Sequence, residues 1–282
     1  MNVLATGARR RATLLLLFGL TLSAGCSRMY LSHYDADIRR ASAAIAAAKT
    51  DAQRGAALAD RGAAYSEKAR YSRLMKLVPF DQYESLFALA LQDFNQAIAL
   101  DPQNPELYFR RGRAYYDRGF ADIQESPHTS SALPPARADF AKVVEKNPSN
   151  AAALDFLGLT DAGLGDWTSA VADFEHEAAF DPLGRSRLPD AYCNRAGTYL
   201  GKKQVDLALA DLNHSIDMRA ESDPCECDPY NMLLAVYLNQ THDYDKARAV
   251  VAKAQAAKHW VAPEYLAQLK SSAASPSRPP TN

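Results

Sequence analysis

The side chains that could carry out catalysis are scattered along the 282-residue sequence. Its six histidines form no H-E-x-x-H zinc motif; they are His33, His128, His176, His214, His242 and His259. The sequence also has no G-x-S-x-G nucleophile motif, no phosphate-binding G-x-x-x-x-G-K-[ST] loop and no G-x-G-x-x-G fingerprint. We therefore predict a protein that is not an enzyme and that has no catalytic residues, no metal site and no cofactor.

The first 25 residues have the composition of an export signal. Three arginines at residues 9–11 precede an uncharged apolar run, residues 13–24, which is too short to cross a bilayer comfortably as a permanent helix. The segment LSAGC at residues 22–26 resembles the bacterial lipobox, in which small residues precede a cysteine that becomes lipidated. The alternative is an ordinary signal peptide that is cut near the same place.

The lipobox resemblance implies that residues 1–25 are removed and that Cys26 carries the lipid, palmitate included, as the first residue of the mature protein. By the same resemblance, Ser27 after the cysteine favours the outer membrane, so we expect a lipid-anchored protein of the cell envelope that faces the periplasm. A net charge of −1 lacks the basic surface that nucleic-acid binding requires. We therefore expect no nucleic-acid partner.

Composition indicates the kind of element that must position any functional side chain. The sequence contains 52 alanines and 13 glycines, and alanine is the best helix former while glycine is among the poorest. With 48% hydrophobic residues the chain has enough apolar material to bury a core. These numbers predict an all-α fold.

Two short patterns recur along the chain. In the first, a small residue follows a large one by four positions and an aromatic residue comes three later, in segments 58–65, 108–115 and 192–199. In the second, an alanine stands four positions before a phenylalanine or leucine, in segments 90–94, 136–140, 170–174 and 208–212. Small residues at these places let two helices approach closely, and bulky residues fill the space around the crossing.

These patterns resemble the tetratricopeptide repeat (TPR). The resemblance implies a right-handed superhelix of helix pairs, with repeats at 55–104, 105–150, 151–184, 189–222 and 228–261. Pro102, Pro148 and Pro182 follow the phenylalanines of three repeats by eight residues, and proline cannot continue a helix. We expect a linker and capping helix within 26–54, with the helix near 38–49, a second cap at 262–270 and a disordered tail at 271–282.

Repeats 1 and 2 contain extra residues between their two helices. The first insertion, residues 66–85, is basic and apolar, and the second, residues 119–135, has the composition of a loop. One hypothesis is a rim that docks a partner, since recognition often occurs on long loops of a rigid scaffold. The alternative is that the helices of these repeats are longer and pack on each other.

The TPR resemblance also implies which residues line a concave, partner-binding groove. The expected partner is an extended or helical polypeptide. Mapping the groove-facing repeat positions onto this sequence gives Phe109, Arg110, Arg113, Tyr116, Asp155, Phe156, Asn194 and Met232. Acidic residues just before the second-helix phenylalanine or leucine, among them Asp139, Asp173 and Asp211, correspond to positions where the pattern commonly has a solvated acid.

Three cysteines remain when Cys26 is lipidated. The repeat geometry brings Cys193, early in the first helix of repeat 4, close to the loop that holds Cys225 and Cys227. In an oxidising periplasm a disulfide from Cys193 to Cys225 or to Cys227 is expected to stabilise the fold by about 3 kcal/mol. Free thiols are the main alternative, and a metal site formed by the C-x-C pair is a further one.

A lipobox followed by about five TPR units is similar to the plan of NlpI-type and PilF-type envelope lipoproteins. That similarity implies a tethered scaffold that binds other envelope proteins. Two alternatives stay open: a structural homodimer whose groove is filled by its own partner chain, and an assembly factor for a pilus or secretin system.

Overall fold

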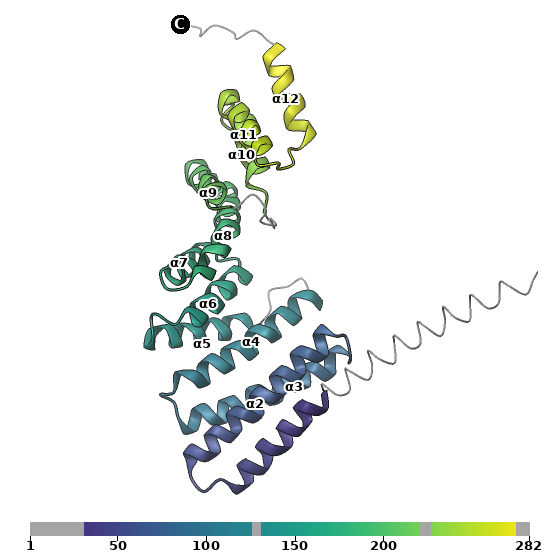
Figure 1. Cartoon of the computed structure of the whole chain (residues 1–282), viewed down its shortest axis with the longest axis vertical. Coiled ribbons are helices and arrows are strands. Elements are labelled where there is room, and N and C mark those ends of the chain that lie inside the picture. The colour runs from purple at the N-terminus through teal and green to yellow at the C-terminus, as the bar shows by residue number, and fades with distance from the viewer. Residues whose placement is uncertain (1–30, 126–130, 220–226, 275–282) are drawn as a thin grey trace, which may run out of the picture. The chain divides into compact units, whose positions relative to one another are not determined.

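The computed structural model describes residues 31–125, 131–219 and 227–274, and this part of the chain is helical with no strand. The prediction of an all-α fold is confirmed. The chain divides into two compact units, residues 1–148 and 149–282, which we describe separately (Figure 1). None of the described helices combines the length and the apolar composition needed to cross a membrane.

The described elements of each unit are consecutive helices. The first unit contains a helix at 31–47, then α2 (Asp51–Leu74), α3 (Phe80–Leu100), α4 (Pro105–Glu125) and α5 (Leu133–Lys146). The second contains α6 (Ala151–Gly163), α7 (Trp167–Glu177), α8 (Pro182–Gly201), α9 (Val205–Met218), α10 (Pro229–Asn239), α11 (Tyr244–Ala256) and α12 (Pro263–Ala274). Within each unit, consecutive helices pack against each other.

Side-chain caps fix where several helices begin. A capping oxygen accepts a hydrogen bond from a backbone N–H that has no partner within the first turn of the helix. Thr50 caps α2, Asn150 caps α6 and Asp166 caps α7, while Asp228 and Asp243 cap α10 and α11. The caps therefore fix the first turn of these five helices, whereas α3, α5 and α9 begin without a side-chain cap.

Glycines lie where the two helices of a pair cross. A Cβ on Gly158 would lie 2.6 Å from the ring of Phe174, and one on Gly112 would lie 3.0 Å from the ring of Phe140. A Cβ on Gly62 would lie 3.1 Å from the carbonyl oxygen of Ala90. The facing small residues are fully buried; they are Ala90, Ala136, Ala170, Ala208 and Ala247. This is the close approach that the recurring small residues predict.

A buried arginine–aspartate pair accompanies three of these crossings. Each guanidinium donates two hydrogen bonds of 2.7–2.8 Å to one carboxylate, in the pairs Arg61–Asp93, Arg111–Asp139 and Arg195–Asp211. The three carboxylate residues are 2–4% exposed, so the expectation that Asp139 and Asp211 are solvated is wrong. The arginine occupies the position before the small residue of the first helix, where its fork reaches the acid of the second helix.

The insertions of repeats 1 and 2 lengthen their helices. Helix α2 runs to Leu74 and α3 begins at Phe80, so most of residues 66–85 are helical and the alternative of longer, mutually packed helices holds there. Helix α4 continues to Glu125, so residues 119–125 are helix where a loop was expected; residues 126–130 lie outside the described part. The extra residues lie between the partners of two ion pairs. The sequence separation is 32 positions for Arg61–Asp93 and 28 for Arg111–Asp139, compared with 16 for Arg195–Asp211.

Helix boundaries differ from the predicted ones at three places. Helix α7 ends at Glu177 and Pro182 starts α8, which continues through Pro189, where the fourth repeat was expected to begin. The helical form of 185–188 buries Leu188 against α7, and proline is tolerated at a first helical position. The N-terminal helix starts at 31 instead of near 38, and α12 continues to Ala274, into the segment expected to be disordered.

The crossing at Gly158 predicts a stability effect. We expect Gly158→Ala to lower the free energy of unfolding by about 1–2 kcal/mol, because the overpacking cost exceeds the gain in helix propensity. In Gly197→Ala, the new Cβ meets only the methyl of Met232 at 3.8 Å, so this control should be neutral or stabilising. Urea unfolding followed by circular dichroism measures both, and a stabilised Gly158→Ala variant would contradict the packing argument.

Candidate protein-binding surface

The first unit has a hollow of about 830 Å³ between the helix at 31–47 and α2. Alanines make up most of its lining: Ala41, Ala44, Ala47, Ala48, Ala56, Ala57, Ala63 and Ala64. Asp37, Asp60 and Glu67 contribute carboxylates, and Tyr34, Arg40 and Gln53 complete the lining. The surface is therefore concave and mainly apolar with charged groups among its lining residues, which is the composition of a binding site.

Two predicted groove residues, both on α4, reach carboxylates that line this hollow. Arg110 lies 3.4 Å from Asp60 and also pairs with Glu106 on its own helix at 2.8 Å. Arg113 lies 3.2 Å from Glu67. The side chain of Asp60 is 70% exposed, so its pairing with Arg110 leaves most of the carboxylate open to solvent.

The two predicted aromatic residues of α4 make contacts inside the unit. The ring of Phe109 meets the buried ring of Phe140 edge-on, with centroids 5.9 Å apart. Tyr116 packs on Phe120 of the same helix at 4.5 Å. Phe109 therefore contributes to packing between α4 and α5.

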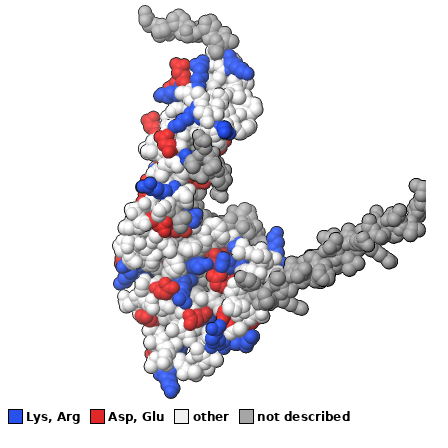
Figure 2. Space-filling model, in the orientation of Figure 1, with Lys and Arg blue, Asp and Glu red and all other residues white. Residues whose placement is uncertain are grey.

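Charges of both signs surround α4. Figure 2 shows Lys and Arg interleaved with Asp and Glu on the visible face of the molecule. Burial raises the pKa of Asp117 to about 6, with Arg113 and Arg70 opposing the shift and Glu67 adding to it. The carboxylate of Asp117 lies 4.0 Å from Arg70 of α2. This part of the surface is held by ion pairs between helices, so its arginines have fixed positions.

In the second unit, the predicted residue Asp155 is engaged by an arginine of α8. Arg187 pairs with the Asp155 carboxylate, and its guanidinium also lies 6.0 Å from the ring centre of Phe174. The neighbouring Glu177 is only 2% exposed, and its Oε2 atom has no hydrogen-bond partner. Burial, followed by the charge of Asp155, raises the pKa of Glu177 to about 7, while Arg187 opposes this shift.

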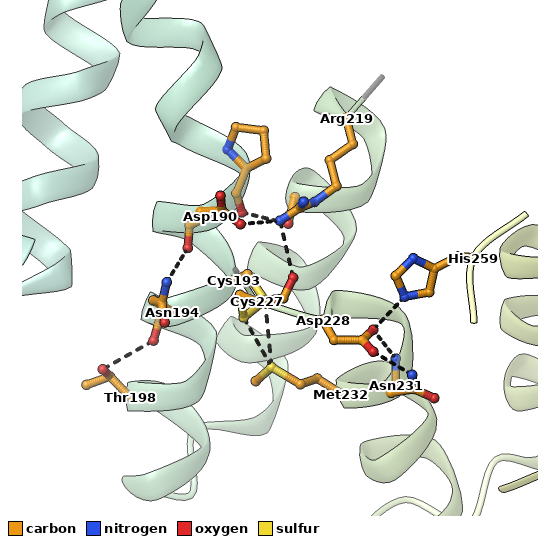
Figure 3. The surroundings of a disulfide bond; sticks show 12 residues. Asp190, Cys193, Asn194, Thr198, Arg219, Cys227, Asp228, Asn231, Met232 and His259 are labelled. Carbon is orange, nitrogen blue, oxygen red and sulfur yellow. Dashed lines mark hydrogen bonds and ion pairs between the residues drawn. A yellow bond between two sulfur atoms is a disulfide. The ribbon is translucent and has the colours of Figure 1, made fainter. Parts of the chain in front are cut away.

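Two further predicted residues of this unit, Asn194 and Met232, lie around a disulfide (Figure 3). Cys193 and Cys227 are bonded, which is one of the two expected pairings; Cys225 lies outside the described residues. The sulfur of Met232 lies 3.7 Å from that of Cys193 and 3.6 Å from that of Cys227. Asn194 donates to the carbonyl of Asp190 at 2.8 Å. Met232 therefore packs on the disulfide.

Ion pairs and caps hold the segment next to this disulfide. Arg219, just after α9, pairs with Asp190 of α8 at 2.5 Å and lies 3.4 Å from the carbonyl oxygen of Cys227. Asp228 caps α10, and its carboxylate oxygen Oδ1 lies 2.9 Å from Nε2 of His259. Figure 3 shows these groups on both sides of the sulfur–sulfur bond. Together they fix the start of α10 against α8 and against the segment before α12.

The structure thus brings together only part of the predicted set. Phe109, Arg110, Arg113 and Tyr116 belong to the first unit, and Asp155, Phe156, Asn194 and Met232 belong to the second. Phe156 is half-buried, and its carbonyl accepts from Thr160 at 2.6 Å. The alanine-lined hollow was not predicted, although the dense alanines of residues 41–48 and 56–64 were a visible signal. Cys26 lies outside the described residues.

Two segments match known repeat profiles. A profile described as TPR repeat matches residues 87–119, and one described as tetratricopeptide repeat matches residues 189–222. These two segments therefore have the sequence pattern of tetratricopeptide repeats. The first match covers the last two thirds of α3 and most of α4, and the second covers most of α8 and all of α9. No curated protein matches the sequence.

Solved structures resemble this chain in fold. Nro1, described as a hypoxic regulator of sterol synthesis and a nuclear import adaptor, matches with a TM-score of 0.58 and 13% identity, over 93% of this chain and 92% of its own. MamA gives a TM-score of 0.42 at 16% identity, over 69% of this chain and 95% of its own. A thermophilic TPR protein of Thermus thermophilus gives 0.37 at 22%, over 72% and 91%. The all-helical fold agrees with a TPR solenoid, and the two repeat matches support a protein-interaction scaffold.

The buried carboxyl group of Glu177 predicts a pH-dependent stability. Its pKa in the folded protein, about 7, exceeds the ordinary value of 4.5, so the folded state holds the proton more tightly than the unfolded state. The stabilisation from this group is full below about pH 4.5 and is lost as the pH rises to about 7. We expect Glu177→Gln to raise the free energy of unfolding at pH 8 by on the order of 2 kcal/mol.

Urea unfolding at pH 5 and pH 8 measures this effect. The gain from Glu177→Gln should be clearly larger at pH 8 than at pH 5. Glu145→Gln, at an exposed position of α5, is the matched control and should change stability by less than about 0.5 kcal/mol at both values. An equal effect of Glu177→Gln at both pH values would refute the assignment.

Proposed function

We propose that this protein is a lipid-anchored TPR adaptor of a bacterial envelope, which binds a segment of another envelope protein in the hollow between the helix at 31–47 and α2. The observation that carries the proposal is the hollow itself, because it is concave, lined by alanines and bordered by carboxylates next to the first TPR helix pair. The lipobox-like segment ending at Cys26 supports the anchor.

A polypeptide suits this hollow better than a small molecule does. Alanine methyl groups leave room for the side chains of an incoming segment, and they have no polar groups that the segment must satisfy with hydrogen bonds. The exposed carboxylate of Asp60 is available to a cationic side chain of the partner, with Arg110 beside Asp60 and Arg113 beside Glu67. Such a mixture of an apolar floor and charged edges is typical of helix-in-groove recognition.

Affinity capture tests the binding half of the proposal. Ala44 and Ala43 are adjacent and exposed on the same helix, but only Ala44 lines the hollow. We expect Ala44→Trp, which fills the hollow, to reduce recovery of the bound envelope proteins at least about tenfold, the loss that 1.4 kcal/mol of binding energy produces. Ala43→Trp should recover them as the wild type does. Equal recovery by both variants would mean that partners bind elsewhere.

Fractionation of cells tests the anchor. A Cys26→Ser variant has no thiol to carry a lipid, so we expect it in the soluble envelope fraction, whereas the wild type should sediment with membranes. A wild-type chain that is equally soluble would contradict the anchor without touching the hollow. A chain whose hollow is occupied by a second copy, seen as a dimer by light scattering that Ala44→Trp dissociates, would favour the homodimer instead.

A further inference from the structure

The turn between α2 and α3 presents large apolar side chains to solvent. Leu74, Met75 and Phe80 are 57%, 54% and 41% exposed. Among the described residues the other exposed large apolar side chains are spread over the chain: Leu89, Phe180, Leu207, Met218 and Trp260. Single exposed apolar residues are normal on protein surfaces, but three within seven positions form a patch that calls for an explanation. We call these three residues the apolar tip.

The apolar tip is held in place by its backbone and by the core beneath it. Lys76 has a φ of 50°, and Leu77 donates its N–H to the carbonyl of Ser72 at 2.9 Å, which closes the end of α2. Val78 points back into a cluster with the buried ring of Tyr83. The turn has thus placed Val78 inside and left Leu74 and Met75 outside, so their exposure belongs to an ordered conformation.

The described chain begins at the same end of the first unit. The helix at 31–47 runs antiparallel to α2, with Asp35 paired to Lys68 at 2.6 Å and the rings of Tyr34 and Tyr71 6.3 Å apart. Each step back along the first helix corresponds to a step forward along α2, which brings Leu31 level with Leu74. In Figure 1 the purple helix lies beside α2.

The length of chain before Leu31 limits where a lipid on Cys26 can be. Five residue steps separate the two positions, and a fully extended chain spans at most about 18 Å over that length. A bilayer that holds the lipid therefore lies within about 18 Å of Leu31. The apolar tip is at that end of the unit, so a membrane surface is the nearest large apolar phase available to it.

The charges of the turn fit a phospholipid surface. Arg73 and Lys76 lie within the segment 73–80, which contains no acidic residue, and Asp81 is the first acid after it. Lys76 is exposed. Apolar side chains with flanking cations are the usual composition of a segment that inserts into the headgroup region, with the cations facing anionic lipids.

We propose that the apolar tip, Leu74, Met75 and Phe80, inserts into the phospholipid surface that carries the lipid anchor and so fixes the orientation of the first TPR unit on the membrane. This inference rests on the anchor proposed above. The chain then contacts the bilayer at two points, the lipid of Cys26 and the tip.

Tryptophan fluorescence in vesicles tests the insertion. Phe80 and Leu89 lie on the same helix and are equally exposed, at 41%, but only Phe80 belongs to the tip. The full lipidated chain, as Phe80→Trp or Leu89→Trp, is reconstituted into vesicles of phosphatidylethanolamine and phosphatidylglycerol with lipids brominated on their acyl chains. The wild type provides the background from Trp167 and Trp260.

We expect brominated lipids to reduce the added emission of Phe80→Trp at least about twofold, since interfacial side chains lie about 5–10 Å deep, and to leave that of Leu89→Trp unchanged. Equal quenching of the two variants, or none, in protein that floats with the vesicles overturns the tip but leaves the anchor intact. A blue-shifted Phe80→Trp that bromine does not quench overturns it in favour of a protein contact. Failure to float overturns the anchor and the tip together.

Discussion

The close approach of two helices at a glycine or alanine is the constraint on which the rest of the structure depends. Because Gly158 and Gly112 have no side chain, the rings of Phe174 and Phe140 lie directly against the facing helix. The short distance between the two helices also lets an arginine of one helix donate two hydrogen bonds to a buried aspartate of the other. The apolar crossing and the bidentate ion pair are therefore parts of one device, in which neither side chain of the pair is left without a partner.

Much of the fold could be predicted from the sequence because the spacing of small and aromatic residues carries it. The five alanines of the second helices and the TPR matches agree with that spacing. The placement of Cys193 near Cys227 also follows from the return of the chain after one helix pair. The repeat pattern determines the packing of neighbouring helices, so these features depend on few interactions between residues that are far apart in the sequence.

Other features depend on which competing interaction is stronger, and a pattern does not show that. Residues 185–188 are helical in α8, which buries Leu188. Pro182, which was expected to end a helix, therefore begins one. The acids at Asp139 and Asp211 are buried because arginines at the right distance compensate them. Phe109, which its repeat position predicts to line a groove, is half-buried and its ring lies against that of Phe140. The alanine-lined hollow depends on how the helix at 31–47 lies on α2, which no single residue encodes.

The sequence separations of the ion pairs show how this fold accommodates growth. Arg61 and Asp93 are twice as far apart in sequence as Arg195 and Asp211, yet the bonds have the same lengths. In the hairpin of α2 and α3 the extra residues lie beyond the crossing, where both helices extend further toward the turn than α8 and α9 do. Each residue added to a helix lengthens it by about 1.5 Å. Evolution or a protein engineer can therefore lengthen a hairpin at its turn without altering the helix crossing or the ion pair.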